Sequence, residues 1–200
     1  MADYRYRIPT GAGRAELREK SSRFLAVIQP VIDEAAVRER LEAVRREFPD
    51  ATHHCWARRL GKPAVERASD DGEPSGTAGA PMLQVLRGAE LSDVLGVVVR
   101  WFGGTKLGKG GLARAYGAAV RAALEELPMG ERFVYEAFKV EVPYDRLGAV
   151  QRLVHPPEVE LVAPEYAATA RCTLRVLPSH RASVLESLAA IGALVERQDT

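Results

Sequence analysis

Cysteine, aromatic residues, net charge and long hydrophobic runs are all scarce in this sequence. Only Cys55 and Cys172 occur among 200 residues, far apart in the chain, which favours reduced thiols over a disulfide framework. A net charge of +1 provides no overall field to draw the chain onto nucleic acid or anionic lipid. No apolar run approaches the length of a bilayer span, and the N-terminal residues lack the apolar region of a signal peptide. We therefore expect a soluble, cytoplasmic protein without a membrane partner.

The hydrophobic content is high enough to build real cores. It amounts to 46 % of the chain, and with aromatic residues at only 6 % the cores must consist mainly of Val, Leu, Ile and Ala. The segment Leu127-Pro128-Met129-Gly130 ends a helical pattern and predicts a domain boundary. We expect an α+β protein with an N-terminal α/β domain at residues 1–130 and a smaller domain at residues 131–200.

Strands and helices are predicted to alternate in the N-terminal domain. Asp33 is placed to cap a helix whose apolar residues, from Val37 to Phe48, recur at helical spacing. The stretch 66–81 has neither helical nor strand periodicity and is expected to be a loop up to a short helix at its end. Strands are expected at 4–8, 22–31, 52–60 and 94–102, and further helices at 81–87 and 112–127.

The C-terminal domain is predicted to follow the order β-α-β-β-α-β, which is typical of ferredoxin-like folds. Strands are expected at 132–142, 158–163, 167–176 and 193–197, and helices at 145–154 and 179–191.

The glycine-rich segment 103–111 matches two nucleotide-binding patterns, and both matches are incomplete. A Walker A loop needs Ser or Thr after its lysine to hold Mg²⁺, and Gly110 stands there. A dinucleotide-binding loop beginning at Gly108 needs an acid at the end of a second strand about 20 residues on. Glu125 and Glu126 lie at that distance but at the end of a predicted helix. A nucleotide pocket is therefore disfavoured.

The charges around these glycines indicate a more general anion site. From Val94 to Leu124 there are five basic residues and no acid. Backbone N–H groups at a helix N-terminus, flanked by lysines, attract phosphate without a nucleotide code. The candidate phosphate-binding residues are Lys106, Lys109, Gly110, Arg114 and Arg121. The phosphates of a nucleic-acid backbone would suit such a site, and no DNA sequence specificity is expected.

An acidic segment, Asp70-Asp71-Gly72-Glu73, allows two interpretations. The three acids could hold Mg²⁺ with His53 as a base. The favoured alternative is a turn whose carboxylates accept backbone N–H groups and cap the next helix. His53 and Cys55 share one face of a strand, but no further zinc ligands have a convincing spacing, so no metal or other cofactor is predicted.

Three sequence motifs resemble those of the YigZ/IMPACT family, bacterial YigZ-type branch. They are ATHHCWA at 51–57, SDDGEPSGTAGAPML at 69–83 and VVVRWFGGTKLGKGGLARAY at 97–116. The resemblance implies an N-terminal domain like domain IV of elongation factor G and a C-terminal domain like its domain V. It supplies no known catalytic residue. The residues carried over by motif are His53, Asp70, Asp71, Gly72, Glu73, Gly76, Gly79, Arg100, Gly103, Gly104, Leu107 and Gly108.

The resemblance also implies a link to translation, since the eukaryotic branch regulates translation by binding an activator of an initiation-factor kinase. We expect a non-enzymatic protein that binds RNA or the ribosome. Two alternatives remain open: a protein-interaction regulator without nucleic acid, and a metal-assisted enzyme acting on a phosphorylated substrate. On the favoured interpretation, Arg100 pairs internally with an acid of 70–73, while Lys106, Lys109 and Arg114 are exposed on one positive face.

Overall fold

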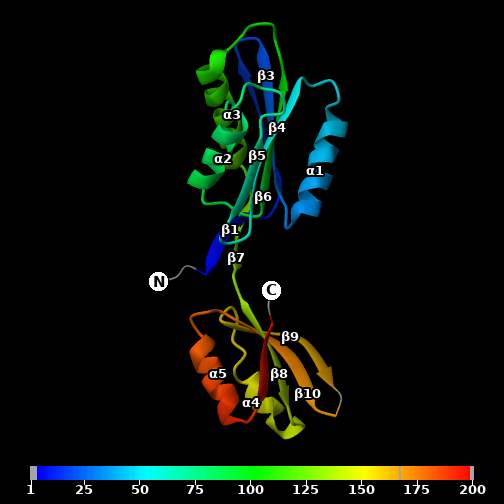
Figure 1. The fold of residues 1–200 in the computed structure, drawn as a ribbon, viewed down its shortest axis with the longest axis vertical. Coiled ribbons are helices and arrows are strands. Elements are labelled where there is room, and N and C mark those ends of the chain that lie inside the picture. The colour runs from blue at the N-terminus through cyan, green and yellow to red at the C-terminus, as the bar shows by residue number, and fades with distance from the viewer. Residues whose placement is uncertain (1–3, 167, 199–200) are drawn as a thin grey trace. The chain divides into compact units, whose positions relative to one another are not determined.

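The structure is a computed structural model that describes residues 4–166 and 168–198. The described residues form two compact units. The larger is Tyr6–Arg132, and the smaller contains the residues from Phe133 onward together with Tyr4 and Arg5 (Figure 1). No helix among the described residues is long and apolar enough to cross a bilayer.

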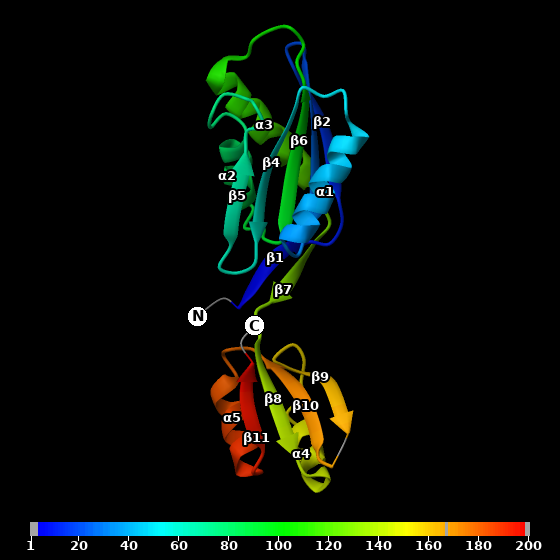
Figure 2. The same ribbon diagram turned by 45° about the vertical axis from the view of Figure 1, so that its right-hand side comes forward.

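The larger unit is built on a five-stranded antiparallel sheet with helices on both faces (Figures 1 and 2). One face carries α1, and the other carries α2 and α3. In sheet order the strands are β2 (Gly13–Glu19), β3 (Ser22–Pro30), β6 (Val94–Trp101), β4 (His53–Leu60) and β5 (Val65–Ser69). The helices are α1 (Glu34–Glu47), α2 (Gly79–Gly88) and α3 (Gly108–Glu125).

The central strand β6 explains why its sequence is almost continuously apolar. Val94 and Val98 pack into the core beneath α2 and α3, whereas Leu95, Val97 and Val99 pack into the core beneath α1. Successive side chains of a strand point to opposite faces, and here both faces are covered. Each such side chain contributes about 1.5–3 kcal/mol relative to exposure.

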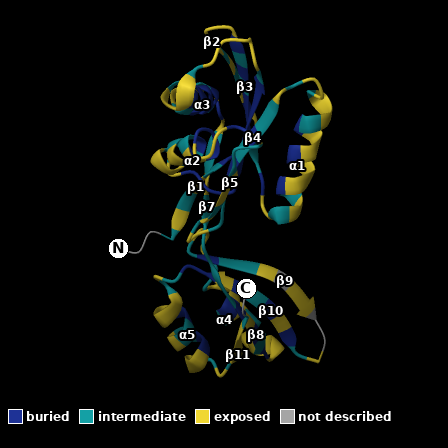
Figure 3. Cartoon of the chain, turned by 45° about the horizontal axis from the view of Figure 1, so that its top comes forward, coloured by how far each residue is buried: buried dark blue, intermediate teal, exposed yellow. Residues whose placement is uncertain are grey.

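Helix α1 begins where its sequence predicts. The Asp33 carboxylate accepts the Ala36 N–H at 2.7 Å, and the buried positions are Val37, Leu41 and Val44. These lie on one face because helical neighbours recur every three to four residues. The outer face of the helix is exposed (Figure 3).

Three local predictions for this unit are wrong. Strand β2 was not predicted, and β5 occupies the first residues of the expected loop 66–81. Both are edge strands with largely exposed, polar sequences, so their pairing with β3 and β4 depends on tertiary context rather than on an apolar pattern. Helix α3 begins at Gly108, four residues before the expected Leu112, because its first turn is glycine-rich.

A short two-stranded ribbon connects the beginning and the end of this unit. It pairs β1 (Arg5–Pro9) with β7 (Met129–Phe133). The buried Asp93 carboxylate accepts the Tyr6 hydroxyl at 2.9 Å and the Gly61 N–H at 2.8 Å, and it pairs with Arg132. These contacts attach the ribbon to the five-stranded sheet.

The smaller unit shows the predicted order of elements. Its four-stranded antiparallel sheet has the strand order β11-β8-β10-β9, and α4 and α5 contribute to its core. The expected strand 132–142 is divided between β7 and β8, and Ala167, at the start of another expected strand, lies outside the described residues. The elements are β8 (Glu136–Val142), a 3-10 helix η1 (Tyr144–Arg146), α4 (Leu147–Gln151), β9 (Val159–Tyr166), β10 (Ala170–Val176), α5 (Arg181–Ala190) and β11 (Leu194–Gln198).

Candidate nucleic-acid interface

The acidic turn between β5 and α2 is held together by Asp70. Its Oδ1 accepts the N–H groups of Ala78 at 2.9 Å and Gly79 at 2.8 Å, and its Oδ2 accepts that of Gly76 at 2.8 Å. Helix α2 has no capping side chain at Ala78, so Asp70 caps it from eight residues earlier in the chain. Partial burial acts to raise the pKa of Asp70, but the three N–H bonds outweigh it and the net shift is downward.

Asp71 connects the same turn to the beginning of β4. Its Oδ2 accepts the His54 N–H at 2.7 Å, and Arg45 of α1 lies 3.4 Å from Oδ1. The Asp71 carbonyl oxygen lies 2.8 Å from His53 Nδ1. Asp71 is therefore occupied by backbone and side-chain partners, as the favoured interpretation of the acidic turn predicts.

Glu73 and Arg100 form a buried ion pair that joins the two long motifs. Their side chains are 3 % and 5 % exposed. The same Glu73 oxygen accepts the Tyr116 hydroxyl at 2.8 Å, and His53 Nε2 lies 4.0 Å away. Arg100 Nη2 also donates to Ser22 Oγ at 3.2 Å. The predicted pairing of Arg100 with an acid of the 70–73 turn is confirmed.

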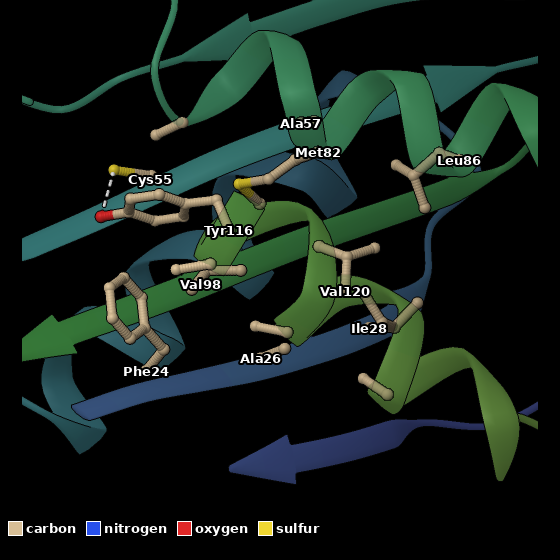
Figure 4. Close-up of a cluster of buried hydrophobic side chains, with 14 of the residues drawn as sticks. Phe24, Ala26, Ile28, Cys55, Ala57, Met82, Leu86, Val98, Tyr116 and Val120 are labelled. Atoms are coloured by element: carbon tan, nitrogen blue, oxygen red, sulfur yellow. Dashed lines mark hydrogen bonds between the residues drawn. The ribbon is translucent and has the colours of Figure 1, made fainter. Parts of the chain in front are cut away.

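Cys55 lies in the core, where its thiol is 3.3 Å from the Tyr116 oxygen (Figure 4). The thiol is also 2.9 Å from the Asp70 carbonyl oxygen. Burial raises the pKa of Cys55 to about 12, and burial also raises the pKa of Tyr116. The thiolate is the nucleophilic form of cysteine. At neutral pH Cys55 is therefore a neutral core residue, and a nucleophilic Cys55–His53 pair is not supported.

The three acids do not converge on a common cation site. Asp70 is engaged by backbone N–H groups, Asp71 by β4 and Arg45, and Glu73 by Arg100 and Tyr116. Across residues 4–166 and 168–198, no group of three His, Cys, Asp or Glu side chains is placed to hold a metal ion. The arrangement supports the capping interpretation of the acidic motif.

The glycine segment packs against the turn between β2 and β3. A Cβ added to Gly103 would lie only 1.8 Å from the Ser21 carbonyl oxygen, so only glycine permits this approach. Gly104 and Gly108 then adopt φ values of +86° and +72°, which lead the chain into α3. Leu107, at the helix N-cap position, packs partly against the core instead of capping the helix with a polar group.

The other motif glycines have structural positions as well. Gly72 and Gly76 have φ values of +88° and +76° in the acidic turn, and Gly79 packs against the backbone of Ser69. Gly110 lies in the first turn of α3, where an added Cβ would meet only the Arg114 guanidinium at 3.5 Å.

The four candidate phosphate-binding cations are exposed, and no carboxylate among the described residues pairs with any of them. They are Lys106, Lys109, Arg114 and Arg121. The first turn of α3 contains no acid, and its N-terminus has no side-chain cap. The N–H groups of this turn and the positive end of the helix dipole therefore add to the positive potential around Lys106 and Lys109.

These cations do not form the single face that the sequence led us to expect. Five residues along an α-helix correspond to a rotation of about 140°, which separates Lys109 from Arg114. Arg114 and Arg121, seven residues apart, share a face and line a groove of about 820 Å³ between α2 and α3. The lysines belong to the glycine segment and the arginines to the groove.

Sequence reasoning missed a further cation, Lys20. It is exposed in the β2–β3 turn with φ +52°, next to Ser21, whose backbone touches Gly103. The contact brings this turn beside the glycine segment (Figure 2). Because β2 was not predicted, nothing in the sequence placed Lys20 there.

Comparison with known proteins identifies the family. The Impact N-terminal domain model matches residues 20–124, the region that contains both long motifs. The chain belongs to the IMPACT family. A Haemophilus influenzae IMPACT family member is 38 % identical over 174 residues, covering 86 % of this chain and 84 % of the relative. The IMPACT family member YigZ of Escherichia coli is 37 % identical over 152 residues, covering 74 % of each chain.

A solved structure described as the crystal structure of a hypothetical protein is also similar. It covers 98 % of both chains with a TM-score of 0.74 and 29 % identity. This IMPACT family chain therefore shares its mixed α/β architecture with a protein solved over nearly the same length. The resemblance inferred from the motifs is confirmed at the level of the family.

Proposed function

We propose that this IMPACT family protein is a non-enzymatic, translation-linked protein that binds RNA through the glycine segment of its larger unit. The observation that carries the proposal is the division of the basic span. Arg100 forms a buried ion pair with Glu73, whereas Lys106 and Lys109 are exposed beside a helix N-terminus that has no side-chain cap. Cations without carboxylate partners, next to free N–H groups, suit the phosphates of a nucleic-acid backbone.

The arrangement of the cations suits the backbone of a nucleic acid better than a single bound nucleotide. The cations Lys20, Lys106 and Lys109 lie in the β2–β3 turn, the glycine segment and the first turn of α3. Such a spread suits several successive phosphates better than one compact ligand. The partner class, RNA or the ribosome, rests on the translational role that the family resemblance implies, together with its suggested likeness to domains of elongation factor G.

The proposal is tested with a charge-reversal variant and a matched control. The test variant combines Lys20→Glu, Lys106→Glu and Lys109→Glu. The control combines Arg38→Glu, Arg40→Glu and Arg46→Glu, which are exposed residues of α1 on the opposite face of the sheet. Both change the net charge equally, so a difference between them reports location rather than total charge.

Binding of a labelled RNA oligonucleotide is measured by fluorescence anisotropy from about 50 to 200 mM salt. We expect the test variant to lose at least tenfold in affinity and to show a shallower salt dependence, since each phosphate contact contributes to the slope. The control should stay close to wild type. Equal affinity of the two variants would contradict the assignment of the site.

A second candidate function is suggested by the groove between α2 and α3. Pro81, Val85 and Leu124 give it apolar walls, and Arg114 and Arg121 give it charge, which together suit an acidic protein segment. Pull-down from native lysate with and without RNase separates the two functions. Partners that are lost on RNase treatment support RNA binding, and partners retained by wild type but lost in Arg114→Glu, Arg121→Glu support a protein interface.

A further inference from the structure

An exposed aromatic ring stands at the entrance of the glycine segment. Phe102 follows the last residue of β6 and is 46 % exposed. Among the described residues of Tyr6–Arg132 it is the one aromatic side chain that is largely exposed. Scattered exposed apolar residues are normal on protein surfaces, so exposure alone carries no conclusion. The fixed backbone around the ring and the cations that follow it in the chain are the observations that point to a binding role.

The backbone on both sides of Phe102 is fixed. Its N–H donates to Thr52 Oγ1 at 3.1 Å, and the next N–H, of Gly103, donates to Ser22 Oγ at 3.3 Å. The Arg100 guanidinium lies 5.4 Å from the ring centroid and is itself held by Glu73. The ring is therefore presented on a rigid strand end, which lowers the entropy lost when a ligand orders it.

Free cations follow the ring closely. Lys106 comes four residues later, so its Cα lies within about 14 Å of that of Phe102. Lys109 follows in the first turn of α3. Aromatic platforms interleaved with cations are how proteins bind single-stranded nucleic acid: bases stack on the ring while phosphates meet the charges.

Building on the proposed function, we infer that the RNA bound here is single-stranded and that Phe102 stacks on an unpaired base beside phosphates held by Lys106 and Lys109. A duplex does not offer its base faces without unstacking, which costs a few kcal/mol per step. The charged residues alone would bind duplex and single strand alike. Phe102 therefore gives the site a preference for unpaired RNA.

Phe102 also covers the buried Arg100–Glu73 pair. The test must therefore distinguish the loss of base stacking from the loss of this cover over the ion pair. Phe102→Leu keeps an apolar side chain over Arg100 but has no flat π face, and Phe102→Trp restores one. Val65→Ala changes another exposed apolar residue of the same unit, 61 % exposed, and serves as the matched control. Thermal unfolding of each variant verifies that the fold is kept.

Affinity is measured for a short single-stranded RNA, the same strand with abasic sites and the corresponding duplex, each over a range of salt concentrations. We expect Phe102→Leu to bind the single strand about tenfold more weakly, since stacking contributes roughly 1–3 kcal/mol per base. Its salt slope should be unchanged, because no charge is lost. Phe102→Trp and Val65→Ala should match wild type, and neither the duplex nor the abasic strand should distinguish the variants.

Unchanged binding of the single strand by Phe102→Leu, or an equal loss for single strand and duplex, would overturn this inference while leaving RNA binding intact. A wild-type protein that binds neither RNA would refute the proposed function and this inference together. A loss in Phe102→Leu that Phe102→Trp does not recover would assign the residue to cover over Arg100 instead.

Discussion

The two long motifs of the larger unit have similar density of glycine and charge, but their charged residues differ in how far they are paired inside the protein. In the acidic motif, Asp70, Asp71 and Glu73 all have partners within the protein. In the glycine motif, Lys106 and Lys109 have none among the described carboxylates. The difference shows that a motif can be specific to a family because it builds the fold. A surface whose charges remain unpaired is the better candidate for binding.

The largest effect should come from breaking the ion pair between the motifs. Glu73→Ala leaves the Arg100 charge buried without its partner, and we expect the free energy of unfolding to fall by about 3–5 kcal/mol. Urea denaturation measures it. The double variant Glu73→Leu, Arg100→Met removes both charges and should lose clearly less. Equal losses in the two variants would show that the cost is packing and not an unpaired charge.

The next largest effect should separate the glycine segment from the β2–β3 turn. In Gly103→Ala the new methyl group would overlap the Ser21 carbonyl oxygen, and we expect a loss of about 2–3 kcal/mol as the backbone shifts. Gly110→Ala is the matched control, because its Cβ meets only a flexible guanidinium. That change should be neutral or slightly stabilising. Similar stability of Gly103→Ala and wild type would refute the close packing.

A smaller effect on stability should come from the Asp70 carboxylate, and it should depend on pH. Because the pKa of Asp70 is lower in the folded protein than its ordinary value of 3.8, its contribution is present above that value and is lost as pH falls below it. Asp70→Asn removes the charge and one of the two accepting oxygens, so it should cost about 1 kcal/mol near neutral pH. Its stability should also fall less steeply than that of wild type below pH 4. Parallel pH profiles measured by denaturation would contradict the role of the carboxylate.

The smallest effect should be an increase in the free energy of unfolding instead of a decrease. Lys20 adopts φ +52°, a conformation that costs a non-glycine residue energy. Part of the relief is offset by the greater entropy of glycine in the unfolded chain, so Lys20→Gly should raise the free energy of unfolding by roughly 0.5 kcal/mol. It should also weaken RNA binding. Ser21→Gly, which lacks a strained residue to relieve, should be slightly destabilising, and the same sign for both would count against strain at Lys20.

Much of the fold could be predicted from local pattern. Helix α1 has a capping residue and helical periodicity, and β6 has a continuous apolar run. The β-α-β-β-α-β order of the smaller unit also follows from local pattern. The edge strands β2 and β5 carry none, since their side chains are largely polar and their pairing is decided by neighbouring strands. Because the β2–β3 hairpin was not predicted, the sequence did not identify Lys20 as a neighbour of the glycine segment.

By itself the sequence determined the family, the unequal distribution of charge and the pairing of Arg100 with the acidic turn. Arg100 lies within the buried strand β6, so its charge needs an internal partner, and the acidic motif offered one in Glu73. Only the tertiary structure decided which cations are free and how they are grouped. Helical rotation separated Lys109 from Arg114, and a contact between Gly103 and Ser21 joined segments more than eighty residues apart. Such distances in space depend on the packing of the whole unit, which no local pattern encodes.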